Sequence, residues 1–404
     1  MSQPHVLLFD EVSARNNLLP FTFTRPVCDI RIGILTIREK WGHDLQRTID
    51  VVTQDYLRPK FPANPATDNL YINGAVSPDE NLLSSIKGLT IGQALVHSGV
   101  LVAYRAGGEY ATLEKLNALP ASTNIIDYEH PLFRIQNVWD IFTKNGEAIE
   151  ADYKRLTHDR VVATAHQSNI LINPERIFIE PGAKVMCSVL NASTGPIYIG
   201  KDAEIMEGCL VRGPFTLGEH STLKMGTKIY GATTIGPHCK VGGEVNNSVI
   251  FGFTNKAHDG FLGNSVIGEW CNLGADTNNS NLKNNYGNVK LWNYDRTGMT
   301  DTGLQFCGLF MADHSKCGIN TMFNTGTVVG VSANVFGAGF PQNFIPSFSW
   351  GGADGFTTYH ILKVYEVAER VLSRRGLEFT KVEKDILSHI FELTSLYRKI
   401  EHNA

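Results

Sequence analysis

Branched aliphatic side chains recur at every sixth position in the middle of the chain. They are Ile199, Ile205, Val211, Leu217, Leu223, Ile229, Ile235 and Val241. Four residues after each of them lies a mostly small side chain, at Ala203, Cys209, Phe215, Ser221, Thr227, Thr233, Cys239 and Val245. A period of six matches neither an α-helix nor a simple alternating strand. It is typical of stacked β-coils, in which each repeat buries its apolar residue against the repeats above and below it.

The six-residue pattern is interrupted twice. It fails from Asn247 to Asp259 and resumes two residues out of phase at Phe261, Ile267 and Leu273. The second interruption is the asparagine-rich stretch 276–303, which we expect to be a folded loop without strands because asparagine readily bonds its own backbone. The pattern then returns at Met311, Cys317, Phe323, Val329 and Val335. Because interruptions of a solenoid usually extrude loops, and such loops often carry function, we expect the chemistry at these two breaks.

The first third of the chain has the pattern of an α/β unit. Short apolar runs predict strands at 6–10, 70–73, 100–104 and 124–126, and helical spacing predicts a helix over 30–41. Between the first strand and that helix lies a predicted loop, 15–26, rich in Arg, Asn and Thr.

Four polar residues in or near this loop are candidates for binding a phosphate or a nucleotide. Arg15, Arg25 and Arg31 could form forked hydrogen bonds to phosphate oxygens close to Thr22. The alternative is that these groups only tie the loop to the sheet, and composition favours neither interpretation.

The patterns divide the chain into four predicted parts. Residues 1–130 form the α/β domain, and 131–160 form a helical linker with apolar faces. Residues 161–345 form the β-coil domain, and 346–404 form C-terminal helices. We expect these helices to cap the open end of the solenoid, because its last coil would otherwise expose strand edges.

Composition excludes several classes of function. Charged residues make up 19% of the 404 residues and the net charge is −4, so no bulk electrostatic affinity for nucleic acid is expected. No basic signal sequence opens the chain and no run approaches 18 apolar residues, so we expect neither secretion nor membrane insertion. The seven cysteines include no CxxC pair or metal-like spacing, so we expect no metal site and a reduced, cytoplasmic protein.

The N-terminal loop resembles the opening of sugar-phosphate nucleotidyltransferases. Leu19-Pro20-Phe21-Thr22 and Arg25-Pro26 match the later part of that motif. Asn16 and Asn17 stand where the family has Gly-Thr, and 130 residues are fewer than the usual domain contains. Such enzymes use a metal ion on the phosphates, and no aspartate pair for Mg²⁺ is evident in the sequence. The resemblance therefore implies Mg²⁺ only if this domain is active.

A more specific resemblance covers roughly residues 195–345. Lys256-Ala257-His258-Asp259, then Phe261-Leu262-Gly263 and Asn272-Leu273-Gly274-Ala275, resemble the motif of the acetyltransferase half of bifunctional UDP-N-acetylglucosamine pyrophosphorylase/glucosamine-1-phosphate N-acetyltransferases. With its altered N-terminal domain, the whole chain resembles a divergent, Bacteroidetes-type variant of that family. The resemblance implies a left-handed parallel β-helix of hexapeptide repeats, acetyl-CoA as co-substrate, and a homotrimer whose neighbouring subunits complete each site.

The same resemblance assigns roles to individual residues. His258 takes the place of the general base, a task suited to a neutral imidazole near pH 7, and Asp259 could orient it. The residues implied to bind the sugar phosphate are Lys224, Lys256, Asn272 and Lys283, and those implied on the acetyl-CoA side are Ala275 and Asn281.

Some residues depart from the family motif or offer alternatives. Asp276 replaces a glycine, and Asn247 stands where the family has a lysine. His314 is the second candidate base. The pair Arg374-Arg375 could meet coenzyme A phosphates or could simply be solvated at a helix end.

Three functions are compatible with these patterns. The first is an acetyl-CoA-dependent N-acetyltransferase acting on an amino-sugar phosphate such as glucosamine-1-phosphate, with or without uridylyl transfer from UTP by residues 1–130. The second is a sugar-1-phosphate nucleotidyltransferase whose β-helix serves only oligomerisation or regulation. The third is a non-catalytic protein that binds sugar nucleotides.

Overall fold

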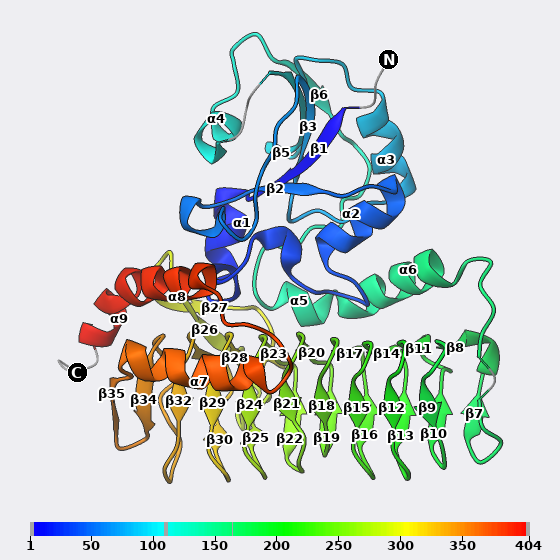
Figure 1. Cartoon of the computed structure of the whole chain (residues 1–404), viewed down its shortest axis with the longest axis vertical. Helices are drawn as coiled ribbons and strands as arrows, with labels where there is room; N and C mark the ends of the chain where they lie inside the picture. Colours follow the sequence, from blue (N-terminus) through cyan, green and yellow to red (C-terminus); the bar gives the residue numbers. More distant parts are fainter. Residues whose placement is uncertain (1–3, 109–111, 164, 401–404) are drawn as a thin grey trace. The chain divides into compact units, whose positions relative to one another are not determined.

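The computed structural model describes residues 4–108, 112–163 and 165–400. The ends of the predicted first and last domains, 1–3 and 401–404, therefore lie outside the described residues. The chain divides into two compact units (Figure 1). The first contains the chain up to Ile30 together with Leu35–Asn137, and the second contains Arg31–Ile34 and the chain from Val138 onward. No helix among the described residues has the length and apolarity needed to cross a membrane.

The first unit is built on a mixed six-stranded sheet in the order β2-β1-β3-β5-β4-β6. Its strands are β1 (His5–Phe9), β2 (Asp50–Val52), β3 (Asp68–Asn73), β4 (Gln93–His97), β5 (Val100–Gly107) and β6 (Asn124–Asp127). Its α-helices are α1 (Val12–Asn17), α2 (Ile37–Leu45), α3 (Glu80–Lys87) and α4 (Leu113–Asn117). The four predicted strands are confirmed, and β2 and β4 are additional. Strand β1 pairs in parallel with β2 and β3, while β5 is antiparallel to β3 and β4.

The helix predicted over 30–41 is wrong in its first half. Helix α2 begins only at Ile37, where Thr36 and Glu39 form a capping box. The preceding segment leaves the helical conformation because its backbone amides bind side chains of helix α6 (Asn145–Thr157). Gly33 N donates to Asn145 Oδ1 at 2.8 Å and Ile34 N donates to Asp152 Oδ2 at 2.9 Å.

The loop predicted over 15–26 is also partly helical. Its first residues belong to α1, where the Glu11 carboxylate accepts hydrogen bonds from the amides of Ser13 and Ala14. Two short 3₁₀ helices follow, η1 (Phe21–Phe23) and η2 (Val27–Asp29), and a third, η3 (Asp55–Leu57), lies after β2. A carboxylate at the N-cap of α1 is favourable because it satisfies amides that have no intrahelical partner.

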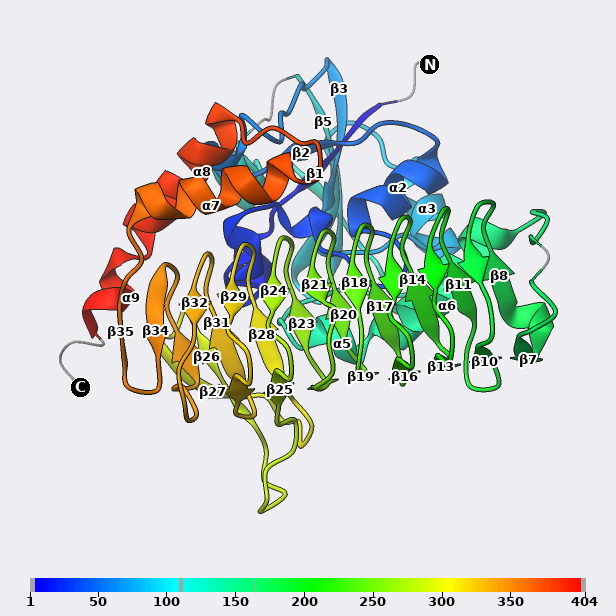
Figure 2. The same ribbon diagram turned by 60° about the horizontal axis from the view of Figure 1, so that its bottom comes forward.

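The second unit is a parallel β-solenoid with three faces (Figures 1 and 2), as the six-residue period predicts. The first solenoid sheet contains β7 (Ile170–Ile172), β10 (Val189–Asn191), β13 (Leu210–Arg212), β16 (Lys228–Tyr230), β19 (Glu244–Asn246) and β22 (Phe261–Gly263). The second contains β8 (Ile177–Ile179), β11 (Ile197–Ile199), β14 (Phe215–Leu217), β17 (Thr233–Ile235), β20 (Val249–Ile250), β23 (Val266–Ile267), β28 (Leu309–Met311), β31 (Thr327–Val329) and β33 (Phe344–Ile345). A 3₁₀ helix, η4 (Pro174–Arg176), joins β7 to β8.

The third solenoid sheet is the longest. It contains β9 (Lys184–Val185), β12 (Glu204–Ile205), β15 (Thr222–Leu223), β18 (Lys240–Val241), β21 (Asn255–Lys256), β24 (Asn272–Leu273), β29 (Lys316–Cys317), β32 (Asn334–Val335), β34 (Ser349–Gly352) and β35 (Gly355–Thr358). All of its neighbours are parallel except β34 and β35, which form an antiparallel hairpin at the end.

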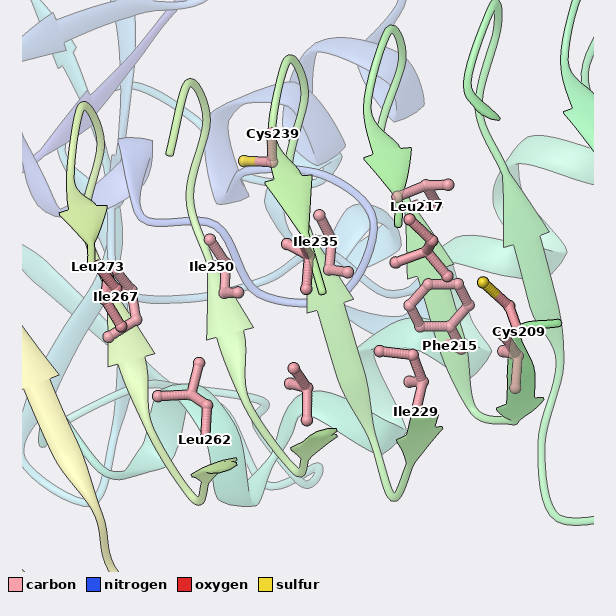
Figure 3. Close-up of a cluster of buried hydrophobic side chains, with 14 of the residues drawn as sticks. Cys209, Phe215, Leu217, Ile229, Ile235, Cys239, Ile250, Leu262, Ile267 and Leu273 are labelled. Carbon is pink, nitrogen blue, oxygen red and sulfur yellow. The ribbon is translucent and has the colours of Figure 1, made fainter. Parts of the chain in front are cut away.

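The aliphatic ladder forms the core of the solenoid. Its members from Ile199 to Val241 are all at most 2% exposed and belong to one buried cluster. Figure 3 shows Leu217, Ile229 and Ile235 pointing into the coil, with Cys209 and Cys239 among the small residues that complete each layer. Each layer therefore packs on the next, and burial of apolar surface holds the stack together.

The long extruded loop expected at the first break does not form, and only a short loop, 257–260, joins β21 to β22. Thr216 pairs with Thr234, eighteen positions on, whereas Thr234 pairs with Val249, only fifteen positions on. The coil is shortened at its turns while the three sheets continue, so the phase of the ladder changes without an extruded loop. One consequence is that Lys256 pairs with Val241 and takes the place of an inward aliphatic residue.

The second break does extrude a loop, as predicted. Val266 pairs with Phe310, and the chain between them leaves the coil and contains an antiparallel hairpin of β26 (Lys290–Asn293) and β27 (Gly298–Asp301). This hairpin packs back on the second solenoid sheet, where Trp292 of β26 stacks on Phe344 of β33 with ring centroids 4.1 Å apart. The expectation of no strand in this stretch is wrong, because β25 (Asn278–Asn279) also pairs in parallel with β30 (Met322–Phe323).

The helices of the second unit are α5 (Asp140–Thr143), α6, α7 (Ile361–Ser373), α8 (Lys381–Leu393) and α9 (Ser395–Ile400). Helix α7 does not cap the open end as expected, because it runs back along the third solenoid sheet (Figures 1 and 2). Its buried residues Val364, Ala368 and Leu372 recur every four positions. Just beyond its end, Arg375 Nη2 donates to the carbonyl of His238 at 3.2 Å.

Candidate functional site

Lys224 and the loop that carries His258 occupy the same corner of the solenoid. This corner follows the third-sheet strands, and its backbone amides bond from coil to coil: Lys224 N to Val241 O and Gly242 N to Lys256 O, both at 2.8 Å. A Cβ added to Gly242 would lie 2.5 Å from Ala257 O and 3.3 Å from Lys224 Cβ. Glycine is therefore required between them, and no side chain separates Lys224 from the start of the His258 loop.

The His258 loop is held by contacts on both sides while its own side chains remain exposed. Lys256 Nζ donates to His258 O at 2.6 Å, and Asp276 N donates to Asp259 O at 3.1 Å. Gly260 has φ +115°, and a Cβ there would lie 2.1 Å from Thr277 O. The imidazole of His258 is exposed, as is Asp259, and no hydrogen bond joins these two side chains. The loop thus presents an accessible imidazole on a fixed backbone.

Lys256 lies inside the coil. Its side chain is 2% exposed, and burial lowers the pKa of its ammonium group to about 8. The nearby carboxylates of Asp259 and Asp276 oppose this shift by favouring the charged form. The hydrogen bond to His258 O therefore couples a buried cation to the backbone of the loop, and the structure places Lys256 beneath the site rather than on its surface.

Asn272 lies on the outer face of the third solenoid sheet. It is exposed and pairs with Asn255 on one neighbouring strand and with Lys316 on the other. Asn255 pairs in turn with Lys240. The four residues therefore form one outward row, in which two carboxamides lie between two cations.

The asparagines of the second break mainly join neighbouring coils. Asn278 Oδ1 accepts a hydrogen bond from Phe261 N at 2.8 Å, and Asn279 Oδ1 accepts one from Gly263 N at 2.9 Å. The amides of β22 thus donate to side-chain carboxamides, where a further strand of the first solenoid sheet would offer backbone carbonyls.

The remaining predicted site residues of the solenoid lie on either side of this stretch. Asn281 Nδ2 donates to Asn264 Oδ1 at 2.8 Å, and Lys283 Nζ donates to Asn288 O at 2.6 Å. The half-buried Ala275 lies one turn beyond the His258 corner, where its carbonyl accepts from Asn320 N at 2.9 Å.

The second candidate base, His314, lies at the opposite edge of the third sheet. It ends a series of rings in left-handed turn positions: His220, His238, Phe253, Trp270 and His314. Its ring centroid is 6.3 Å from that of Trp270, and the planes are nearly parallel. His314 and His258 therefore belong to different edges of the sheet.

The predicted nucleotide-binding residues of the first unit are buried. Arg15 Nη2 donates to Tyr56 Oη at 3.0 Å and to Thr22 O at 3.3 Å, and the Thr22 hydroxyl donates to Arg15 O at 2.7 Å. Arg25 is only 5% exposed. Arg31 belongs to the second unit, where its guanidinium donates to Ile34 O. Of the two interpretations of this motif, the contacts of Arg15 and Thr22 support the one in which polar groups tie the segment to the sheet.

The carboxylate that follows β1 does not fit a magnesium site. Asp10 is 1% exposed, its oxygens accept from Val27 N at 2.7 Å and from the Thr53 hydroxyl at 2.6 Å, and burial raises its pKa to about 6. Among the described residues, no group of three or more His, Cys, Asp or Glu side chains could hold a metal ion.

Lys240 and Lys316 lie beside Asn272, and the sequence analysis did not single them out. They lie with Asn272 on the outer face of the third sheet, and both are positively charged. Each immediately precedes an inward residue, Val241 or Cys317, and neighbouring residues of a strand point to opposite faces. The six-residue pattern could therefore have identified both lysines as outward-facing, since the residue before each inward residue faces outward.

Comparisons with known proteins match part of the chain to one family model and also find several solved structures. Residues 6–161, less than half of the chain, match the family model described as sugar nucleotidyl transferase. No curated protein matches the chain.

Three solved structures illustrate the structural likeness. A UDP-N-acetylglucosamine acyltransferase from Arabidopsis is 18% identical, with 59% of this chain and 83% of that one covered and a TM-score of 0.25. The D94A mutant of AntD, an N-acyltransferase from Bacillus cereus in complex with dTDP and coenzyme A, is 15% identical, with 51% and 91% covered and a TM-score of 0.23. A UDP-N-acetylglucosamine acyltransferase from Campylobacter jejuni is 14% identical, with 55% and 94% covered and a TM-score of 0.21.

Replacing Lys256 by methionine should make the free energy of unfolding depend less on pH. Because the pKa of Lys256 falls from 10.5 to about 8 on folding, the unfolded chain binds the extra proton between these pH values. Wild-type stability should therefore rise by about 3 kcal/mol from pH 7 to pH 10.5 relative to Lys256→Met. Urea unfolding of the full chain, followed by circular dichroism at several pH values, measures the difference. The exposed Lys201→Met is the control, and equal pH slopes in wild type and Lys256→Met would contradict the buried charge.

Proposed function

We propose that the solenoid unit transfers an acetyl group from acetyl-CoA to the amine of an amino-sugar phosphate, with glucosamine-1-phosphate as the first substrate to test. The observation that carries this proposal is the shared corner of Lys224 and the His258 loop, kept free of side chains by Gly242. The sugar identity comes from the motif resemblance around His258 and Asn272.

In this reaction the amine nitrogen attacks the thioester carbonyl, so that a C–N bond forms and the C–S bond breaks. His258 accepts the proton that the nitrogen loses, and coenzyme A leaves as a thiolate that then takes up a proton. A general base of this kind works best when its pKa is near the operating pH and its ring can reach the amine. The exposed imidazole on a fixed loop supports this role.

Two neighbouring residues would bind the sugar phosphate. The Lys224 ammonium supplies a positive charge at the corner without the fork of an arginine, and the Asn272 carboxamide lies on the adjacent face. Lys256 would act as a positioning residue, because it holds the His258 carbonyl from inside the coil. Ala275 and Asn281 would lie toward acetyl-CoA, and Lys283 toward the sugar.

The first test is thiol release from acetyl-CoA in the presence of glucosamine-1-phosphate. Wild type should release thiol, and His258→Ala should lose at least about 100-fold in kcat, the usual range for a general base. His166→Ala, an exposed histidine of the first coil, is the matched control and should keep full activity.

Lys224 provides a second variant for the same assay. Lys224→Ala should mainly raise KM for the sugar phosphate, and Lys224→Arg should restore it, because the charge and not the exact side chain is needed. Full activity of His258→Ala with the fold intact would rule out the assigned base.

A second candidate function, sugar-1-phosphate nucleotidyl transfer by the first unit, is favoured by the family match over residues 6–161. Its test is the release of pyrophosphate from UTP and a sugar-1-phosphate with added Mg²⁺. If this activity is present and thiol release is absent, the solenoid serves oligomerisation or regulation. If both are absent and a sugar nucleotide still raises the melting temperature, the chain is a binding protein.

We also propose that the chain acts as a homotrimer, as the resemblance implies. Large apolar side chains are exposed near the His258 corner and on the first solenoid sheet: Met225 at 69%, Ile319 at 70%, Leu210 at 51% and Tyr230 at 38%. Exposed apolar groups on one side of a protein often mark an interface. Light scattering should give three times the chain mass of 44.6 kDa. A monomer at micromolar concentration would contradict this assembly.

A further inference from the structure

Helix α7 and the third solenoid sheet enclose a pocket of about 350 Å³. On the solenoid side it is lined by the outward row Lys240, Asn255, Asn272 and Lys316, and on the helix side by Val371, Arg374 and Arg375. All these residues belong to the second unit. We call this the α7 pocket.

The register of the strands sets the spacing of the row. Lys240 pairs with Asn255, Asn255 with Asn272, and Asn272 with Lys316, so all four side chains leave the same face. Neighbouring strands lie about 4.8 Å apart, which places the two lysine backbones roughly 14 Å from each other. The pocket therefore has a cation at each end of its floor and two carboxamides, which can donate or accept hydrogen bonds, between them.

The four cations of the α7 pocket lack acidic partners. No carboxylate lines the pocket, and no ion pair forms between the described residues and Lys240, Lys316, Arg374 or Arg375. Lys316 Nζ donates to His314 O at 3.0 Å and Arg375 Nη2 to His238 O at 3.2 Å, which leaves most of their donors available. Such a group of like charges is unfavourable unless an anion joins it.

The lowered pKa values of the two lysines are consistent with the same lack of acidic partners. The pKa of Lys240 is lowered first by burial and then by the charges of Arg375, Lys224 and Arg374, and burial also lowers the pKa of Lys316. The carboxyl end of α7 attracts cations through its partial negative charge, which could account for Arg374 and Arg375. It does not account for the two lysines, which lie on a sheet with little net dipole.

We propose that the α7 pocket binds a nucleotide that carries a diphosphate, with its phosphates held between the lysine row and Arg374–Arg375. The volume lies within the range of about 300–1,000 Å³ that small-molecule sites have. Phe253 and Trp270, stacked at 4.2 Å, add an apolar aromatic edge against which a base or sugar can pack. Two sources share this chemistry: coenzyme A and a nucleotide-linked sugar such as UDP-N-acetylglucosamine.

The inference rests on the proposed function to the extent that Asn272 borders both the α7 pocket and the proposed acetyl-transfer site. Binding can nevertheless be measured without turnover, so the two proposals fail separately. Loss of thiol release in His258→Ala with unchanged nucleotide binding would separate catalysis from the pocket.

The experiment is isothermal titration of the full chain with four probes: coenzyme A, UDP-N-acetylglucosamine, pyrophosphate and inorganic phosphate. The double variants are Lys240→Gln/Lys316→Gln and Arg374→Gln/Arg375→Gln. Each should weaken binding of the preferred nucleotide at least tenfold, and binding to wild type should weaken more steeply with salt than binding to either variant. Lys240→Arg/Lys316→Arg, which keeps the charge, should retain most of the affinity.

Matched controls come from the same row and the same helix. Lys184→Gln changes an exposed lysine of β9 in the same register, and Arg370→Gln changes an exposed arginine of α7 outside the pocket. Both should bind as wild type, and circular dichroism checks that every variant is folded. A preference for coenzyme A assigns the pocket to the acyl donor, and a preference for UDP-N-acetylglucosamine assigns it to a sugar nucleotide. The proposal is overturned if neither nucleotide binds wild type, or if the folded pocket variants bind as tightly as the controls.

Discussion

The structure of the solenoid depends on the burial of one inward aliphatic side chain per six residues against the same position in the next coil. This contact sets the register of three parallel sheets, and a register fixed on the inside also fixes every side chain on the outside. The row Lys240–Asn255–Asn272–Lys316 exists for this reason: each member precedes an inward residue on successive strands. The candidate chemistry thus lies on surfaces whose spacing the core determines.

The two places where the inward aliphatic pattern fails lie beside the candidate site. At the first break the coil loses three residues, and the inward position is filled by Lys256, whose ammonium binds the backbone of the His258 loop. A buried charge is costly, and its pKa of about 8 records that cost. At the second break, carboxamides of Asn278 and Asn279 replace backbone pairing between coils. In both places the regular packing is given up beside the residues proposed to bind and react.

Sequence prediction succeeded where local pattern and tertiary packing agree. The six-residue period specified the solenoid, and apolar runs specified strands β1, β3, β5 and β6. It failed where distant contacts override local preference: residues 30–36 have helical spacing, yet Asn145 and Asp152 take the amides of Gly33 and Ile34. Sequence also left open whether Arg15 binds phosphate or ties its segment to the sheet, and the structure shows it buried in α1, where it donates to Tyr56 Oη and Thr22 O.

By itself, the sequence determined that the chain forms stacked coils after an α/β unit and that a histidine motif lies at the first phase change, since both follow from spacing along the chain. Only the tertiary structure decided which side of the coil each polar residue occupies. Shortening of one coil moved Lys256 inside and left His258 exposed at the corner of Lys224. The packing of α7 on the third sheet brought Arg374 and Arg375 to Lys240 and Lys316, more than fifty positions away in sequence. A local pattern predicts that α7 is amphipathic, but it does not predict against which strands the apolar face of the helix packs.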